Sequence, residues 1–117
     1  GQPTVGLEPE ELKLLSGSEE AHKISRREIG IAITKGWSGG TTVSATMHIS
    51  NIANIKTFST GGIGGVHFGG SKSFDISQDL FSLSNTSQIV ISAGIKAVLD
   101  IPKTFEHLET LGVTVVG

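Results

Sequence analysis

The chain has 117 residues, enough for one domain with a modest hydrophobic core, and its 37% hydrophobic and 17% charged residues are typical of a globular protein rather than a disordered one. A net charge of −2 offers neither the basic field that nucleic acids bind nor a polybasic membrane patch. The absence of cysteine excludes disulfides and thiolate metal sites, and it fits a reducing compartment.

The first half of the chain predicts short elements separated by glycines. A proline followed by acidic residues indicates a helix start, and a following glycine indicates its end. The expected elements are a helix from Pro9 to Gly17, an extended piece over residues 22–25, a helix from about Arg26 to Gly36, a turn over residues 37–40, and a helix opened by Thr41 and Thr42 with Val43, Met47 and Ile52 at apolar positions.

The second half begins with a short apolar run, Ile55 to Ser59, that leads into a glycine-rich loop. The loop carries Gly61, Gly62, Gly64, Gly65, Gly69 and Gly70. The elements expected after it are a helix over residues 77–84, a strand over 87–92, a helical segment over 96–100, a helix from Pro102 to Gly112 and a final strand over 113–116.

Alternation of strands and helices predicts an α/β fold, a layered α/β/α arrangement with a mixed, partly parallel sheet. Nothing follows the final predicted strand to cover it, so we expect the sheet to be incomplete in this segment. Ligands of such sheets bind outside the carboxyl ends of the strands. The glycine loop and Lys96 both fall at predicted strand ends.

The glycine loop is the clearest candidate for a binding site. Each glycine costs backbone entropy, so we interpret this many as a cradle of N–H groups for an anion or phosphate rather than as a packing device. Asp75 and Asp79 are four residues apart and would share one face of a helix. The alternative for this pair is a helix cap plus a solvated acid.

Lys96 follows the second apolar run, between Ile95 and Ala97. A lysine amine is a nucleophile only when neutral, and with an ordinary pKa of about 10.4 it is almost fully charged at pH 7. A dry environment or a nearby helix start would lower the pKa and favour the neutral form. A surface lysine that extends past apolar neighbours is the alternative.

Four motifs, GGTTVSATM, TGGIGGVH, FDISQDL and SAGIKAVLDIPKTFEHLETLGV, closely resemble the pseudouridine-5'-phosphate glycosidase family, also called the indigoidine synthase A-like family. Members are well over twice as long, so the resemblance implies that residues 1–117 are the central part of a single domain of this kind. It also implies reversible cleavage of the C–C glycosidic bond of pseudouridine 5'-phosphate to uracil and ribose 5-phosphate.

The resemblance assigns roles residue by residue. Lys96 would form a Schiff base with the sugar C1', and Asp75 would hold a divalent cation, usually manganese. Asp79 could in addition orient Lys96 or move its proton. The implied substrate contacts are Lys23, Thr42, Val43, Thr60, Gly61, Gly62, His67, Ser77, Gln78 and Asp79.

The resemblance further implies a homo-oligomer, expected as a trimer, with small-molecule substrates and no nucleic-acid or membrane partner. The expected compartment is the cytoplasm, or the mitochondrion or peroxisome if the parent chain carries a targeting segment.

Two departures from the family pattern favour a second interpretation. Phe68 stands where members usually carry arginine. The family's general-acid glutamate precedes the segment covered here, and the glutamates of the first half do not lie in its motif; these are Glu8, Glu10, Glu11, Glu19, Glu20 and Glu28. The alternative function is a non-catalytic phosphosugar- or nucleotide-binding module, or an inactive fragment.

Overall fold

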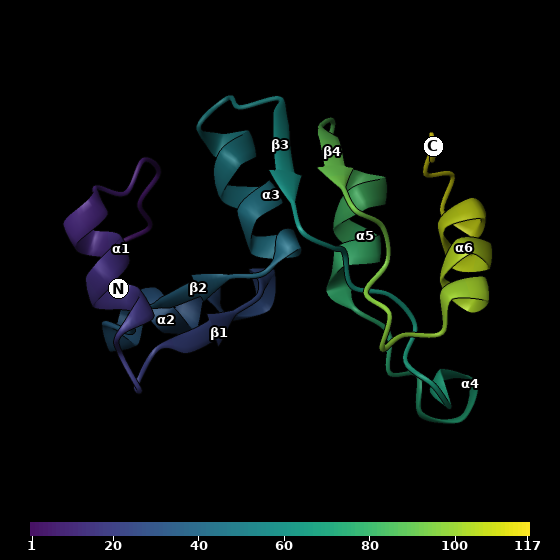
Figure 1. Ribbon diagram of the computed structural model, residues 1–117, viewed down its shortest axis with the longest axis horizontal. Helices are drawn as coiled ribbons and strands as arrows, with labels where there is room; N and C mark the ends of the chain where they lie inside the picture. The colour runs from purple at the N-terminus through teal and green to yellow at the C-terminus, as the bar shows by residue number, and fades with distance from the viewer.

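The structure is a computed structural model that describes all residues, 1–117, and it is elongated, with extents of 40 × 30 × 24 Å (Figure 1). In chain order the elements are α1 (Pro9–Ser16), β1 (His22–Ile24), the 3-10 helix η1 (Arg26–Glu28), α2 (Ile29–Lys35), β2 (Gly39–Thr41), α3 (Val43–Ile52), β3 (Thr57–Thr60), α4 (Gly70–Ser73), α5 (Gln78–Asn85), β4 (Ile89–Ser92) and α6 (Ile101–Thr110). None of these helices has the length and apolar character needed to cross a membrane.

The strands form two separate parallel pairs. β1 pairs with β2, and β3 pairs with β4. Parallel neighbours need a crossover connection, which η1 and α2 supply for the first pair and α4 and α5 supply for the second (Figure 1). The predicted α/β class with parallel strands is therefore confirmed.

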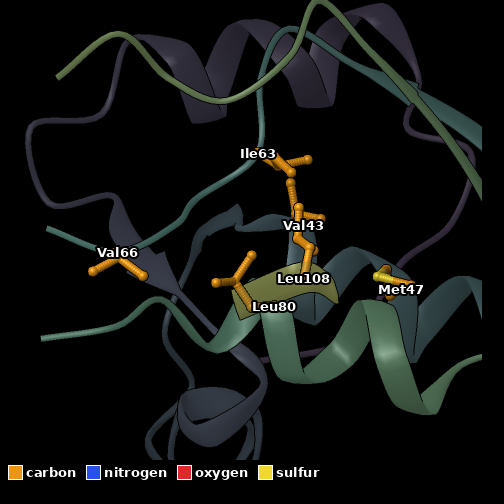
Figure 2. Close-up of a cluster of buried hydrophobic side chains, with 6 residues drawn as sticks. All are labelled: Val43, Met47, Ile63, Val66, Leu80 and Leu108. Atoms are coloured by element: carbon orange, nitrogen blue, oxygen red, sulfur yellow. The ribbon is translucent and has the colours of Figure 1, made fainter. Parts of the chain in front are cut away.

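One apolar cluster joins the central elements. Its buried members are Val43, Met47, Ile63, Val66, Leu80 and Leu108 (Figure 2). They come from α3, the glycine loop, α5 and α6. The loop thus contributes two side chains to the core, and its residues 63–66 are buried, whereas Gly61 and residues 67–69 are exposed.

The helix starts predicted at Thr42 and Ser77 are confirmed to within one residue, and Asp100, predicted as helical, instead caps α6. Thr42 immediately precedes α3, and Ser77 precedes α5, where its hydroxyl accepts a hydrogen bond from the Asp79 N–H at 3.2 Å. Asp100 precedes α6, and its carboxylate accepts from the Lys103 N–H at 3.2 Å. Such caps satisfy N–H groups that the first turn of a helix leaves unpaired.

Three local predictions are wrong. Residues 39 and 40 are in β2 rather than in a turn, because they pair in parallel with His22 and Lys23 of β1. Residues 96–100 form a turn, since the backbone of Lys96 pairs with Ile63 instead of starting a helix. Residues 113–116 are not a strand, because no neighbouring strand pairs with them.

One face of the β3–β4 pair has no covering element. Ile89 is 65% exposed and Ile91 is 58% exposed, whereas Phe58 and Val90, on the opposite face, pack against the core cluster. Within the 117 residues this sheet is covered on one side only, although the strand over residues 113–116, on which the prediction of an incomplete sheet rested, is not formed.

Candidate active site

The candidate site forms where the strands end. Thr60 is the last residue of β3, Gly61 and Gly62 follow it, and a parallel bridge between Ile63 and Ile95 brings the two chain segments together just before Lys96. A Cβ on Gly62 would lie 3.2 Å from Lys96 Cγ. The stem of the Lys96 side chain therefore passes directly over the glycine loop, at the edge predicted from the sequence.

Hydrogen bonds hold the backbone of Lys96 in this position. Its N–H donates to Ile63 O at 3.1 Å, and its carbonyl accepts from the Leu99 N–H at 3.0 Å. The Ile63 N–H donates to Gly94 O at 3.0 Å, and Gly94 has a φ of 120°, a conformation that favours glycine. The side chain of Lys96 is exposed, so these residues alone do not supply the dry environment that we expect for a neutral amine.

Two glycines of the loop are required by packing. A Cβ on Gly64 would lie 2.6 Å from Ser77 Cβ, and a Cβ on Gly65 would lie 2.6 Å from Thr104 Cγ2, both closer than side chains tolerate. These positions are glycine because α5 and α6 press against the loop backbone. The interpretation that the loop glycines do not serve packing is therefore wrong for Gly64 and Gly65.

Only part of the predicted N–H cradle is free. The Gly64 N–H donates to Asp79, and the Val66 N–H donates to Thr104 at 2.9 Å. The N–H groups of Gly61 and Gly62 donate to no acceptor in the chain, and the same is true of those of Gly65, which is buried, and Gly69. An anion could bind the loop at Gly61 and Gly62, which are the two adjacent to Lys96.

Asp79 joins the loop to the start of α3. Its side chain is 4% exposed; Oδ1 accepts from the Ser44 N–H at 2.9 Å and Oδ2 accepts from the Gly64 N–H at 2.8 Å. A carboxylate at a helix N-terminus is also favoured by the helix dipole. Both oxygens are thus occupied by main-chain donors. Asp75 precedes α5 and is exposed, so the prediction that the two acids share one helix face is wrong.

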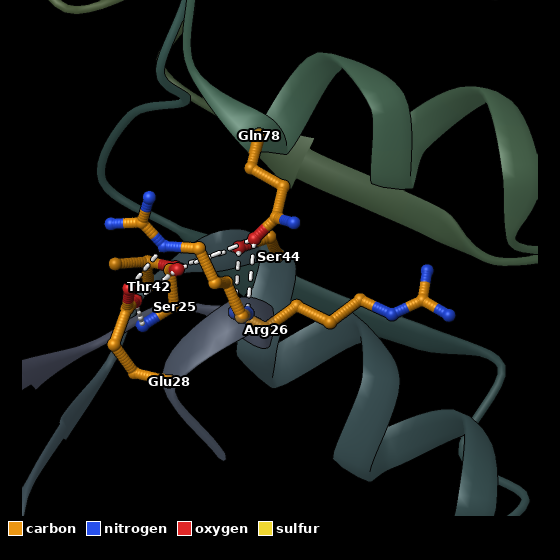
Figure 3. Close-up of polar contacts among 7 residues, drawn as sticks. Ser25, Arg26, Glu28, Thr42, Ser44 and Gln78 are labelled. Carbon is orange, nitrogen blue, oxygen red and sulfur yellow. Dashed lines mark hydrogen bonds and ion pairs between the residues drawn. The ribbon is translucent and has the colours of Figure 1, made fainter. Parts of the chain in front are cut away.

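A polar network ties the end of β1 to the starts of α3 and α5 (Figure 3). Gln78 Oε1 accepts from the Ser25 hydroxyl at 3.3 Å and from the Arg27 N–H at 3.2 Å. The Arg26 N–H donates to the Ser44 hydroxyl at 3.3 Å, and that hydroxyl lies 2.9 Å from the hydroxyl of Thr42.

The sequence analysis missed Ser25 and Ser44 as parts of this network. The Ser-x-x-Glu spacing of residues 25–28 is a capping-box pattern and could have revealed Ser25. Ser44 has no comparable local signal, because its partners lie in η1 and α5.

Comparison with known proteins gives the family. A model of the family described as indigoidine synthase A like protein matches residues 1–117. The chain belongs to the indigoidine synthase A-like family. Two relatives are named pseudouridine-5'-phosphate glycosidase. The one from Dinoroseobacter shibae is 57% identical over 113 residues, which cover 97% of this chain and 37% of the relative. The one from Caldanaerobacter subterraneus subsp. tengcongensis is 51% identical over 117 residues, which cover 100% of this chain and 38% of the relative.

Solved structures agree with this assignment. The prealnumycin C-glycosynthase AlnA, described in complex with ribulose 5-phosphate, superposes with a TM-score of 0.88 at 42% identity, over 92% of this chain and 36% of that one. An indigoidine synthase A-like protein from Thermotoga maritima gives a TM-score of 0.84 at 44% identity, over 92% and 35%. The chain thus spans well under half the length of these relatives.

The other predicted contacts of this indigoidine synthase A-like chain lie on β1 and at the starts of α3 and α5, and they differ in exposure. Lys23 is an exposed residue of β1, opposite Gly40 of β2. Thr42 and Ser77 are half-buried, and Val43 is buried at the first position of α3.

His67 lies beside Asp75 at the far end of the glycine loop. Its N–H donates to Asp75 O at 3.0 Å, and its Nδ1 is 3.9 Å from Asp75 Oδ2. The His67 side chain is 49% exposed, that of Asp75 is 64% exposed, and Phe68 is 72% exposed. The pair is open to solvent, and Phe68 makes no polar contact there.

Glu28, the acid nearest to the site network, is held as a carboxylate. The hydroxyl of Ser25 donates to it, and Arg27 Nε donates at 2.5 Å. These bonds, first that from Ser25 and then that from Arg27, lower the pKa of Glu28 from 4.5 to about 2. It is ionised at neutral pH and cannot donate a proton as a general acid, in accord with its position outside the family's glutamate motif.

Glu28→Gln should lower stability at neutral pH and flatten its pH dependence. Because the folded pKa of Glu28, about 2, is below the ordinary 4.5, its stabilisation is complete above pH 4.5 and is lost as the pH falls from there towards 2. Thermal unfolding of the full-length variant across this range should show a smaller slope than the wild type. Glu109→Gln, on the exposed end of α6, should leave the slope unchanged; an equal slope in Glu28→Gln would contradict the assignment.

Proposed function

We propose that the full-length protein containing this chain is a pseudouridine-5'-phosphate glycosidase that cleaves or forms the C–C glycosidic bond through a Schiff base on Lys96. The observation that carries the proposal is the fixed position of Lys96 over Gly62, next to two main-chain N–H groups without acceptors. The names of relatives with about half of their residues identical over this segment support it.

A lysine suits this bond because a C-glycoside has no heteroatom leaving group that a carboxylic acid could protonate. Hydrolysis by two carboxylates through an oxocarbenium ion is therefore poorly suited to the substrate. In the direction of bond formation, the Lys96 amine instead condenses with the C1' aldehyde of open-chain ribose 5-phosphate and releases water; uracil C5 then adds to the iminium carbon and loses its proton, and the sugar C4' hydroxyl closes the ring as the amine leaves. Cleavage is the reverse: the amine replaces the ring oxygen at C1', uracil leaves with the C–C bonding electrons and a proton at C5, and water hydrolyses the remaining iminium to ribose 5-phosphate.

The sugar phosphate would bind along the free part of the loop. Gly61 and Gly62 present N–H groups, and the N–H of Val43 lies in the first turn of α3, where the helix dipole favours an anion. Lys23, the middle residue of β1, would add a point charge. The described complex of AlnA with ribulose 5-phosphate, a phosphosugar, supports a ligand of this class.

Manganese is a separate prediction that these residues do not fulfil alone. No group of three or more histidine, aspartate or glutamate side chains gathers in the chain, and Asp75 has only His67 near it, at 3.9 Å. Two donors are too few for an ion that takes about six ligands. We propose only that Asp75 contributes one ligand to a metal site that other parts of the complete protein would complete.

The exposure of Lys96 supports the proposal that further protein covers the site. Removal of bulk solvent favours the neutral, nucleophilic form of a lysine amine. We infer that the remainder of the full-length protein, or a partner subunit of a homo-oligomer such as a trimer, supplies this cover.

A non-catalytic phosphosugar-binding module is the second candidate. It is favoured by Glu28, which is held ionised, and by Phe68, which offers no charge to an anion. Such a module would keep the loop and α3 contacts but would not break the glycosidic bond.

Incubation of the full-length protein with pseudouridine 5'-phosphate separates the two candidates. The glycosidase should release uracil in proportion to ribose 5-phosphate, both measured by chromatography. Calorimetric binding of ribose 5-phosphate without uracil release would select the binding module, and the absence of both binding and release would reject both candidates.

A further inference from the structure

Thr104 is a fully buried polar residue on α6, outside the predicted substrate contacts. Its exposed fraction is 0%. Its hydroxyl accepts from the Val66 N–H at 2.9 Å and donates to Asp100 O at 2.7 Å. The first bond connects α6 to the glycine loop, the second lies within the start of α6, and together they use both hydrogen-bonding roles of the hydroxyl.

The contact between α6 and the loop is close as well as polar. The methyl group of Thr104 packs against the backbone of Gly65. Any larger residue at position 65 would clash, since its Cβ would be 2.6 Å from Thr104 Cγ2. The Asp100 N–H adds a bond to Val66 O at 2.8 Å. The main chain of Val66 is therefore bonded on both sides by the first turn of α6.

The segment of the glycine loop that contains Val66 also holds the backbone of Lys96. Three residues before Val66, the Ile63 carbonyl accepts from the Lys96 N–H at 3.1 Å, and the Ile63 N–H donates to Gly94 at 3.0 Å. A displacement of the loop at residues 65–66 would move Ile63, and with it the backbone of Lys96. No other side-chain hydroxyl or carboxylate of α6 bonds to this loop.

We propose that Thr104 is a positioning residue whose hydroxyl fixes the position of loop residues 61–66 relative to Lys96. By fixing that position, it determines the rate at which the Lys96 amine bonds to the sugar. The effect on rate rests on the proposed function; the effect on the loop does not. Thr104 contacts neither the amine nor the predicted substrate residues, and it acts through Val66 and Ile63.

Two substitutions in the full-length protein isolate the hydroxyl. Thr104→Val keeps the shape of the side chain and loses both hydrogen bonds, whereas Thr104→Ser keeps the hydroxyl. Leu108→Val, one turn later on α6 and buried in the core cluster, is a control for a general loss of stability.

The first measurement is amide hydrogen exchange at Ile63 and Lys96, whose N–H groups do not contact Thr104. Thr104→Val should accelerate exchange there by about tenfold, while Thr104→Ser and Leu108→Val should stay within about twofold of the wild type. Equal acceleration in Leu108→Val, or none in Thr104→Val, would overturn the proposal whether or not the protein is a glycosidase.

The second measurement is the rate of borohydride trapping with ribose 5-phosphate. If the wild type forms the adduct, Thr104→Val should form it about tenfold more slowly at saturating sugar, with Thr104→Ser near the wild-type rate. An unchanged rate in Thr104→Val would overturn the positioning role. A wild type that traps no sugar would reject the Schiff base, and the exchange result would then decide the structural part of the proposal alone.

Discussion

Lys96→Ala in the full-length protein is expected to lose completely the covalent adduct that borohydride traps with ribose 5-phosphate. The alanine has no amine to form the imine, and the backbone bonds that hold residue 96, to Ile63 and Leu99, are retained. Because the side chain is exposed, the free energy of unfolding should change by no more than about 0.5 kcal/mol. Intact-mass spectrometry after reduction measures the adduct.

The matched control is Lys56→Ala. Lys56 is another exposed lysine, and it lies just before β3, at the opposite end of that strand from the candidate site. This variant should trap the sugar at the wild-type rate. Retention of the adduct in Lys96→Ala, or its loss in Lys56→Ala, would place the reactive amine elsewhere.

Asp79→Asn is expected to have the largest effect on stability. The carboxylate accepts from Ser44 and from Gly64 in a buried position, and an amide of the same shape can accept from only one of these two N–H groups. The other N–H remains buried without an acceptor, at a cost of about 1–3 kcal/mol, and the favourable interaction with the α3 dipole is lost. Urea unfolding of the full-length protein measures the change.

Asp75→Asn is the matched control for this substitution. The Asp75 carboxylate is 64% exposed and lies 3.9 Å from its only neighbouring charge partner, His67. Its free energy of unfolding should therefore stay within about 0.5 kcal/mol of the wild type. If Asp79→Asn were as stable as Asp75→Asn, the bridging role of Asp79 would be wrong.

Local structure was predictable wherever a residue acts on its own neighbours in the chain. Thr42, Ser77 and Pro102 were correctly placed at or next to helix starts. The Ser77 hydroxyl caps α5 through the Asp79 N–H, and a proline in the first turn removes an N–H that would have no partner, so both effects act within four residues. The errors at residues 39–40, 96–100 and 113–116 all concern pairing with distant segments. No local pattern reports whether such a partner is present.

For the candidate site, the sequence by itself determined the family, the α/β class and the position of Lys96 next to the glycine loop, because motif spacing and strand ends are local properties. Only the tertiary structure decided what the loop does. Gly64 and Gly65 are glycines because side chains from α5 and α6, 13 and 39 positions further along the chain, occupy the space of a Cβ. The same long-range contacts make Asp79 a bridge between main-chain donors and leave Gly61 and Gly62 as the free part of the cradle beside Lys96.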